Sequence, residues 1–185
     1  MSTLTPAENL TEEQLLSMPH LGKTEMIDGR LIVAPAGFEH GDVALALAGE
    51  LRNHVRKHKL GRVVDSSTGF WMRSGNLLSP DVAFVAAARL QGLKRLPRKY
   101  FRGSPDLVAE VLSPNDRPAE IERKIAEYFE TDTRLLWLVD PEQRTVQVYR
   151  DGRVTRTLRG NEAIDGEDVV PGFVLKLEDL FEQPD

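Results

Sequence analysis

Three ionisable side chains lie within segments that are otherwise apolar. Glu110 interrupts the apolar run Leu107–Leu112, which Ser-Pro steps bound on both sides and which predicts a strand buried on both faces. Lys124 falls on the apolar face of the helix predicted over residues 121–129. Asp81 opens a further predicted strand. A buried charge is costly unless it is paired, so these three side chains are the first candidates for a functional site.

These residue types suit metal-assisted hydrolysis. Asp81 and Glu110, on neighbouring strands, could hold one or two Mg²⁺ (or Mn²⁺) ions, because Mg²⁺ prefers hard oxygen ligands and retains several waters. The metal would activate a water and neutralise the charge that builds on a phosphate during attack. Lys124 could orient that water or stabilise the negatively charged transition state.

Each assignment has a plainer alternative. The Pro-Asp step at Asp81 could be ordinary turn chemistry at the start of a strand. Glu110 and Lys124 could form a buried ion pair without a metal, an arrangement that need not stabilise the fold. Glu25, on the first strand of a predicted hairpin, is either a third acid near the metal or a surface residue. His40 either positions a water or phosphate, or caps the start of a helix.

The composition restricts the class of protein. The chain has 185 residues, 41% hydrophobic and 29% charged, which suits one α/β domain spanning residues 1–185. It lacks the run of about 18 apolar residues that a membrane span needs, and it shows no secretion signal, so a cytoplasmic location is expected. The absence of cysteine excludes disulfides, zinc–thiolate sites and cysteine nucleophiles. With a net charge of −5, nucleic-acid binding would have to come from a local basic patch.

The segments that would position the candidate residues alternate between strands and helices. The sequence predicts one hairpin over Thr24–Val33 and another that turns at Asp151-Gly152. Helical spacing covers residues 42–59, and Gly61 is expected as the glycine that ends this helix. Residues 78–86 predict a single strand with Asp81 at its start.

The connection over residues 88–104 carries charges of one sign. No acid interrupts its six cations, which are Arg89, Lys94, Arg95, Arg98, Lys99 and Arg102. It could be a solvated loop, or it could supply phosphate contacts that depend strongly on salt. Because it joins the strands that carry Asp81 and Glu110, a place near the site is expected.

Together these motifs resemble the PD-(D/E)XK nuclease superfamily, and more narrowly the Uma-two family of restriction-endonuclease-like proteins. The segments that carry the resemblance are Ser79-Pro80-Asp81-Val82, Glu110-Val111-Leu112-Ser113-Pro114 and Lys124 to Tyr128. Four further segments fit the same family: Glu25 to Leu31, His40-Gly41, Trp137 to Pro141 and Pro171-Gly172-Phe173. The resemblance spans roughly Thr11 to Phe181, and the order and spacing of the motifs carry it.

The resemblance implies a restriction-endonuclease-like fold, with a mixed central sheet flanked by helices and added β-hairpins. It implies a Mg²⁺-dependent endonuclease that acts on nucleic acid, with DNA as the expected substrate. One departure is Leu112, which stands where the motif has lysine, and Lys124 is the substitute that the resemblance implies. A non-catalytic nucleic-acid-binding or regulatory module of the same fold is the alternative, and a homodimer is the assembly considered.

Overall fold

A mixed six-stranded sheet forms the centre of the molecule. The computed structural model describes residues 2–6, 10–17, 23–33 and 36–182. In spatial order the strands of the central sheet are β12 (Arg153–Arg159), β11 (Thr145–Arg150), β10 (Leu135–Asp140), β9 (Leu107–Val111), β7 (Val82–Ala86) and β4 (Gly61–Asp65). The pair β9–β10 is parallel and the other neighbours are antiparallel. The predicted mixed sheet is therefore confirmed.

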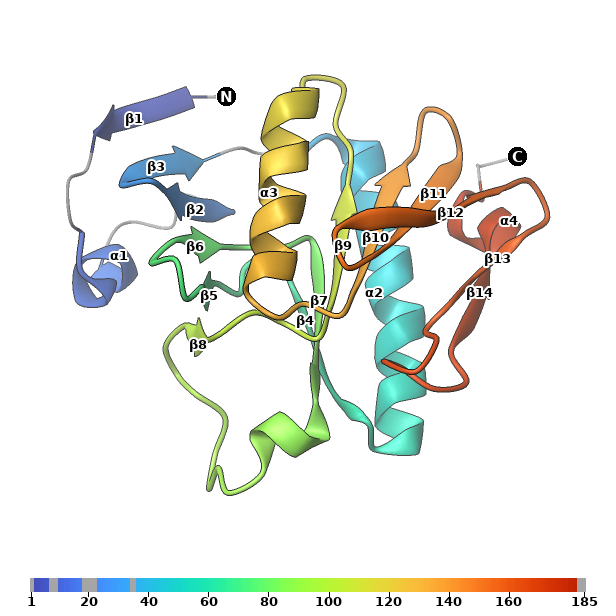
Figure 1. Ribbon diagram of the computed structural model, residues 1–185, viewed down its shortest axis with the longest axis horizontal. Helices are drawn as coiled ribbons and strands as arrows, with labels where there is room; N and C mark the ends of the chain where they lie inside the picture. Colours follow the sequence, from blue (N-terminus) through green and yellow to red (C-terminus); the bar gives the residue numbers. More distant parts are fainter. Residues whose placement is uncertain (1, 7–9, 18–22, 34–35, 183–185) are drawn as a thin grey trace.

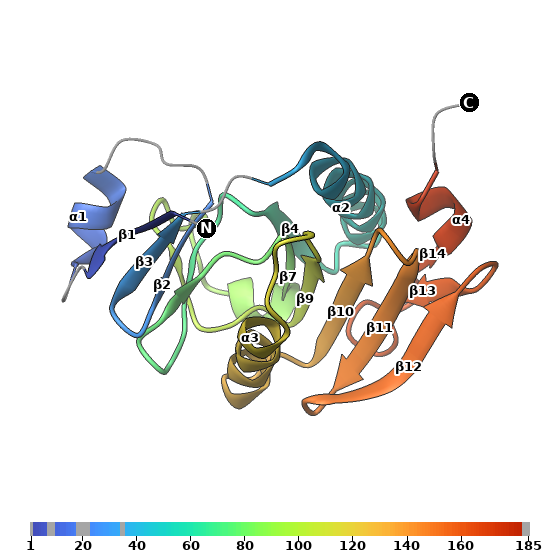
Figure 2. The same cartoon turned by 90° about the horizontal axis from the view of Figure 1, so that it is seen from above.

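Two long helices cover opposite faces of this sheet, as Figure 2 shows: α2 (Phe38–His58) and α3 (Pro118–Glu130). Side chains of β9 alternate between the two faces, as the pleat requires. Leu107, Ala109 and Val111 join the core under α2, whereas Val108 joins the core under α3. By the same alternation, Glu110 faces α3. Neither these helices nor the short ones in the described ranges are long and apolar enough to cross a membrane.

A second sheet lies beside the central one (Figure 1). Its strands in spatial order are β1 (Ser2–Pro6), β3 (Arg30–Val33), β2 (Thr24–Ile27), β6 (Leu77–Leu78), β5 (Phe70–Trp71) and β8 (Phe101–Arg102). The hairpin β2–β3 confirms the predicted turn, in which Asp28 and Gly29 both have positive φ, 49° and 71°. Helix α1 (Glu12–Ser17) packs Leu15 against Met26 of this sheet.

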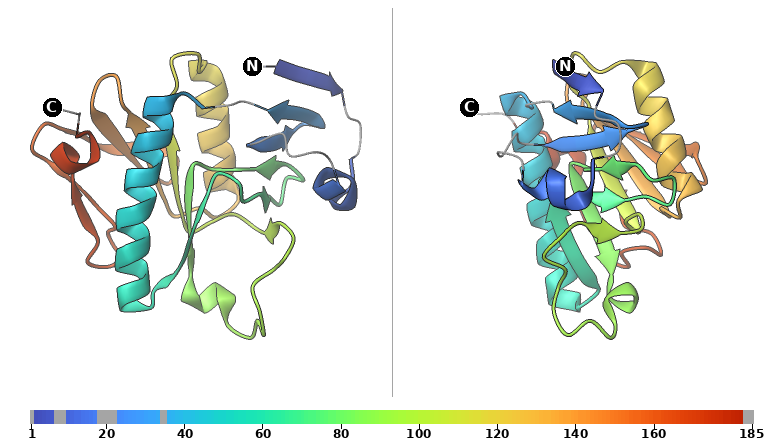
Figure 3. Two further views of the ribbon diagram at one scale, coloured as in Figure 1. Left: turned by 180° about the vertical axis from the view of Figure 1, so that it is seen from behind. Right: turned by 90° about the vertical axis from the view of Figure 1, so that its left-hand side faces the viewer.

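The C-terminal segment returns to the face of the sheet that α2 covers. It forms β13 (Ala163–Asp165), β14 (Val174–Lys176) and the short helix α4 (Leu177–Leu180), which lie beside α2 in Figure 3. Ile164, Leu175 and Leu180 join the core that α2 buries. The predicted hairpin at Asp151-Gly152 is confirmed as the turn between β11 and β12.

Two predicted boundaries were wrong. Residues 78–86 do not form one strand, because the chain leaves the second sheet after β6 and enters the central sheet at β7, with Ser79, Pro80 and Asp81 between them. Gly61 does not end α2. Lys59 takes the left-handed conformation there, with φ 56°, and Gly61 begins β4.

The basic connection lies at the far end of the central strands from Asp81, contrary to expectation. It includes the 3-10 turn η1 (Ala87–Leu90) and β8, and it occupies the lower part of Figure 1. Strands β7 and β9 are antiparallel, with Val82 opposite Ala109. The end of β7 and the start of β9, which this connection joins, are therefore remote from the ends that carry Asp81 and Glu110.

The close approach of β4 and β7 requires glycine at position 61. A Cβ atom there would overlap the backbone oxygen of Val85, so Gly61→Ala must push the two strands apart. We expect it to lower the free energy of unfolding by about 1–3 kcal/mol in urea titrations. Gly49→Ala is the matched control, because Gly49 lies in α2 and a Cβ added there would have no neighbour within 4 Å. It should instead raise stability by about 0.5–1 kcal/mol, and equal effects would contradict this explanation.

Candidate active site

Strand register brings the two carboxylates of Asp81 and Glu110 together. Val82 pairs with Ala109, so the next residue pair along the antiparallel ladder is Asp81 and Glu110. Both residues are buried, with 3% and 5% of their surface exposed. The backbone N–H of Val111 donates a hydrogen bond of 2.9 Å to Asp81 Oδ2, which fixes that carboxylate beside the end of β9.

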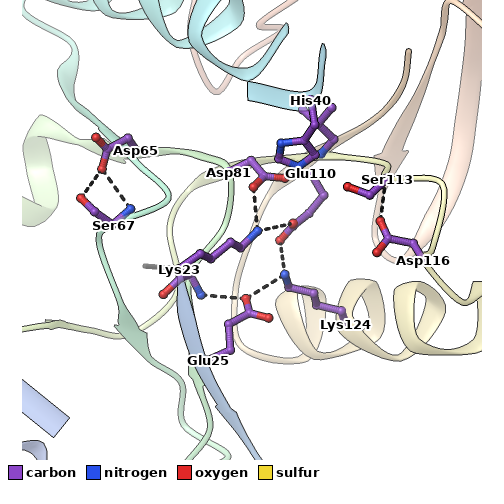
Figure 4. A network of polar contacts seen from close by, with 12 residues as sticks. Lys23, Glu25, His40, Asp65, Ser67, Asp81, Glu110, Ser113, Asp116 and Lys124 are labelled. Atoms are coloured by element: carbon purple, nitrogen blue, oxygen red, sulfur yellow. Dashed lines mark hydrogen bonds and ion pairs between the residues drawn. The ribbon is translucent and has the colours of Figure 1, made fainter. Parts of the chain in front are cut away.

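Lys124 reaches Glu110 from α3. Pro118 opens this helix with its φ already fixed, and the apolar face of the helix then packs on the sheet. Lys124 Nζ lies 2.9 Å from Glu110 Oε1 and 2.8 Å from Glu25 Oε1, and its side chain is 12% exposed. Figure 4 shows the ammonium group between these two carboxylates.

Tyr128 lies four residues after Lys124 on the same face of α3, and its hydroxyl donates a hydrogen bond of 2.7 Å to Glu110 Oε1. Burial and the carboxylates of Glu110 and Glu25 raise the pKa of Tyr128 well above its ordinary value. The phenol therefore remains a donor at neutral pH. In the sequence Tyr128 is part of an apolar face, so periodicity alone indicates a core residue.

Glu25 is not a surface residue of the hairpin. It is 8% exposed, and its Oε1 accepts a hydrogen bond of 2.9 Å from the backbone N–H of Ser79 as well as contacting Lys124. The alternative that placed Glu25 on the surface was therefore wrong. Its carboxylate fixes both the chain just before Asp81 and the ammonium group of Lys124.

Lys23 belongs to the same cluster, although the sequence analysis did not identify it. Its Nζ lies 2.6 Å from Asp81 Oδ1 and 3.6 Å from Glu110 Oε2, and its side chain is 20% exposed. Figure 4 shows the amino group between the two carboxylates. A signal was present, because Lys23 precedes Glu25 by two residues and the alternation of an extended chain puts both on one face.

His40, in the first turn of α2, contacts Asp81 from the opposite side. Its Nε2 lies 3.1 Å from Asp81 Oδ2, and its side chain is 10% exposed. Nδ1 is buried and has no hydrogen-bond partner within the part of the chain that the structure describes. His40 therefore holds Asp81 through one ring nitrogen and buries the other.

Burial raises the pKa of both carboxylates, but their neighbours offset this effect to different extents. For Glu110, removal from water raises the pKa, and the ammonium groups of Lys124 and Lys23 offset this only in part. For Asp81, burial acts in the same direction, but the hydrogen bond with His40 and the charge of Lys23 outweigh it and hold the pKa well below its usual range. Burial opposes the charged form of Lys124, yet the neighbouring carboxylates, first Glu110 and then Glu25, raise its pKa.

A cavity of about 500 Å³ gives access to this cluster. Lys23, Glu110 and Lys124 line it, together with Arg30 and Arg117 nearer its rim. Both signs of charge are therefore present in one cavity, because acids such as Glu25 and Asp116 line it as well.

The donor set fits a metal held by two carboxylates and water. Asp81 Oδ1 and Glu110 Oε2 converge on one position, which is already taken by a positive group, Lys23 Nζ. No group of three or more His, Cys, Asp or Glu side chains within the described ranges is arranged to hold a metal ion. Mg²⁺ needs only one or two protein carboxylates, because it retains several waters.

Comparisons with known proteins identify the family and support the fold. The model of the Uma2 family, described as "Putative restriction endonuclease", matches residues 12–178. Among solved structures, the chain is similar to a "putative nuclease belonging to DUF820" from Anabaena variabilis ATCC 29413, with a TM-score of 0.78 and 21% sequence identity. That match covers 94% of this chain and 98% of the other, and at this identity it shows the fold. No curated protein matches the chain.

The hydrogen bond from Tyr128 to Glu110 can be tested by stability. Tyr128→Phe removes the only hydroxyl that donates to Glu110 among the described residues, so we expect a loss of about 1.5–3 kcal/mol in the free energy of unfolding. Tyr149→Phe is the control, because the Tyr149 hydroxyl bonds the neighbouring Gln147 in a half-buried setting. Its effect should stay within about 0.5 kcal/mol, and a Tyr128 effect of that size would show that the bond is unimportant.

Proposed function

The chain belongs to the Uma2 family of restriction-endonuclease-like proteins, and from this membership we propose that it is a metal-dependent endonuclease that hydrolyses phosphodiester bonds of nucleic acid, with DNA as the expected substrate. The observation that carries the proposal is the convergence of Asp81 and Glu110 on one cation position, with Lys124 2.9 Å from Glu110. Two adjacent acids with a lysine beside them suit such a hydrolysis, and Glu110 and Lys124 line the cavity that leads to them.

Each residue of the cluster has a distinct role in this proposal. Asp81 and Glu110 would hold Mg²⁺ or Mn²⁺, which when bound supplies an activated water and neutralises charge on the phosphate. Lys124 places a fixed positive charge beside the scissile phosphate, where negative charge grows in the transition state. Glu25 holds Lys124 in place through its contact of 2.8 Å, and His40 fixes the orientation of Asp81.

Lys23 must leave before a metal can bind. Its ammonium group contacts both proposed ligands, and two cations cannot share one position. Lys23 lies just before β2 and is the most exposed member of the cluster at 20%, so its side chain can swing toward solvent while the strands stay in place. Lys23 would thus serve as an internal counter-ion for Asp81 and Glu110 in the metal-free protein.

The same contact favours a second candidate function. Because Lys23 already pairs with Asp81 and Glu110, these acids have a cationic partner without a metal, and the fold could serve as a non-catalytic nucleic-acid-binding module. Binding that persists in chelator, without cleavage when metal is added, would distinguish this function from the endonuclease.

Cleavage assays test the proposed activity. Purified protein with Mg²⁺ or Mn²⁺ should cut linear or circular DNA, and chelator should abolish the reaction. Lys124→Met should lower the single-turnover rate about 10²–10³-fold, because it removes a charge that stabilises the transition state. Glu110→Gln should remove activity and weaken Mn²⁺ binding together.

Controls separate the roles of these residues. Lys57→Gln, which changes an exposed lysine on α2 that forms no ion pair within the described residues, should cut like the parent. DNA and RNA that remain intact with either metal, combined with no measurable Mn²⁺ binding, would refute the endonuclease. A Glu110→Gln variant that cuts like the parent would refute the site.

The role of Lys23 can be measured without any substrate. Lys23→Gln removes the competing ammonium group, so we expect Mn²⁺ affinity in calorimetry to rise about tenfold, which corresponds to about 1.4 kcal/mol. Lys57→Gln makes the same change in net charge away from the cluster and should leave the affinity almost unchanged. If both variants bind Mn²⁺ equally well, Lys23 does not compete with the metal.

A further inference from the structure

Cations without acidic partners gather on a surface remote from the carboxylate cluster. Five are arginines: Arg52 and Arg56 of α2, Arg62 of β4, and Arg95 and Arg98 of the basic connection. Two lysines, Lys59 and Lys94, extend the same surface. Within the described residues, the ion pairs include none of these seven side chains. We call this surface the basic groove.

The basic groove is concave and continuous. It consists of two hollows of about 620 and 580 Å³, and both are lined by Arg56, Arg62, Leu90 and Leu96. No Asp or Glu of the described residues lines either hollow.

The basic connection divides its six cations between two tasks. Arg89 pairs with Asp106, Lys99 with Glu13 and Arg102 with Glu12, so these three fasten the connection to the rest of the fold. The remaining three, Lys94, Arg95 and Arg98, line the groove without an acidic partner among the described residues. Ion pairs therefore hold the connection to the fold near both of its ends. The three cations between these contacts have no acidic partner among the described residues.

Repulsion between seven like charges weakens the fold unless a counter-charge is bound. The chain as a whole carries a net charge of −5, so acids were available in the sequence to neutralise this face. Their exclusion from the groove points to an external polyanion. Arginine predominates, and its planar guanidinium group matches the geometry of phosphate.

We propose that the basic groove binds the sugar-phosphate backbone of nucleic acid as a second site, separate from the carboxylate cluster. His40 and Arg56 lie on the same helix, and at 1.5 Å per residue their spacing corresponds to about 24 Å. A concave, elongated groove fits a polymer chain better than it fits a flat lipid surface. The inference rests on the proposed function only for the identity of the polyanion, because binding here needs neither metal nor cleavage.

Salt dependence of binding tests the groove directly. Fluorescence anisotropy with a 20-bp DNA duplex in chelator compares the parent with the double variant Arg56→Gln/Arg62→Gln. The slope is that of the logarithm of the association constant plotted against the logarithm of the salt concentration. Losing two phosphate contacts should reduce the magnitude of this slope by about 2. Between 50 and 200 mM salt, the parent should then lose about tenfold more affinity than the double variant.

The matched control lies on the opposite edge of the central sheet. Arg153→Gln/Arg159→Gln removes two exposed arginines of β12, so it makes the same change in net charge far from β4. Its slope should equal that of the parent. Equal slopes for the two double variants would overturn the proposal, as would anionic phosphatidylserine vesicles that bind the groove more tightly than the duplex does.

This result is independent of catalysis. A parent protein that binds DNA through the groove but never cuts it refutes the endonuclease and keeps the second site. A protein that cuts DNA with unchanged salt dependence in Arg56→Gln/Arg62→Gln keeps the endonuclease and refutes the second site. The substituted side chains are at least partly exposed, so unchanged thermal unfolding should confirm that both double variants fold.

Discussion

Buried charges of alternating sign constrain the whole molecule. They form a chain in which each contact joins an acid to a base, in the order Asp81, Lys23, Glu110, Lys124 and Glu25. Charges removed from water are tolerated only when they are paired, and the loss of one partner leaves another charge uncompensated. The geometry of these five side chains is therefore set by one another as much as by the strands and helices that carry them.

The cluster also explains why the molecule needs two sheets. The second sheet contributes Glu25, with Lys23 just before it, the central sheet contributes Glu110, and the two long helices supply Lys124 and His40. No single element brings both signs of charge together. The ion pairs thus fasten the hairpin β2–β3 to the central sheet, and the cavity opens where these elements meet.

Local pattern predicted much of the fold and part of the site. Glu110 and Lys124 could be identified because a charged residue within an apolar pattern can be recognised from the sequence alone. Lys23 was missed because its partner Asp81 is 58 residues away, and its spacing of two residues from Glu25 was the only signal that the sequence offered. The basic connection was misplaced because it joins the end of β7 to the start of β9. The antiparallel pairing of these strands puts Asp81 and Glu110 together at their opposite end. Gly61 was misassigned because only the folded strands reveal its contact with Val85.

Because β7 and β9 are antiparallel, evolution or engineering could change the loop that joins them independently of the carboxylate cluster. The long connection between β7 and β9 leaves the sheet at the end of these strands opposite the acids, and doubling the length of a flexible loop costs only about 0.6 kcal/mol. Insertions between its anchored ends, such as a fluorescent label, should therefore leave the geometry of the carboxylate cluster unchanged.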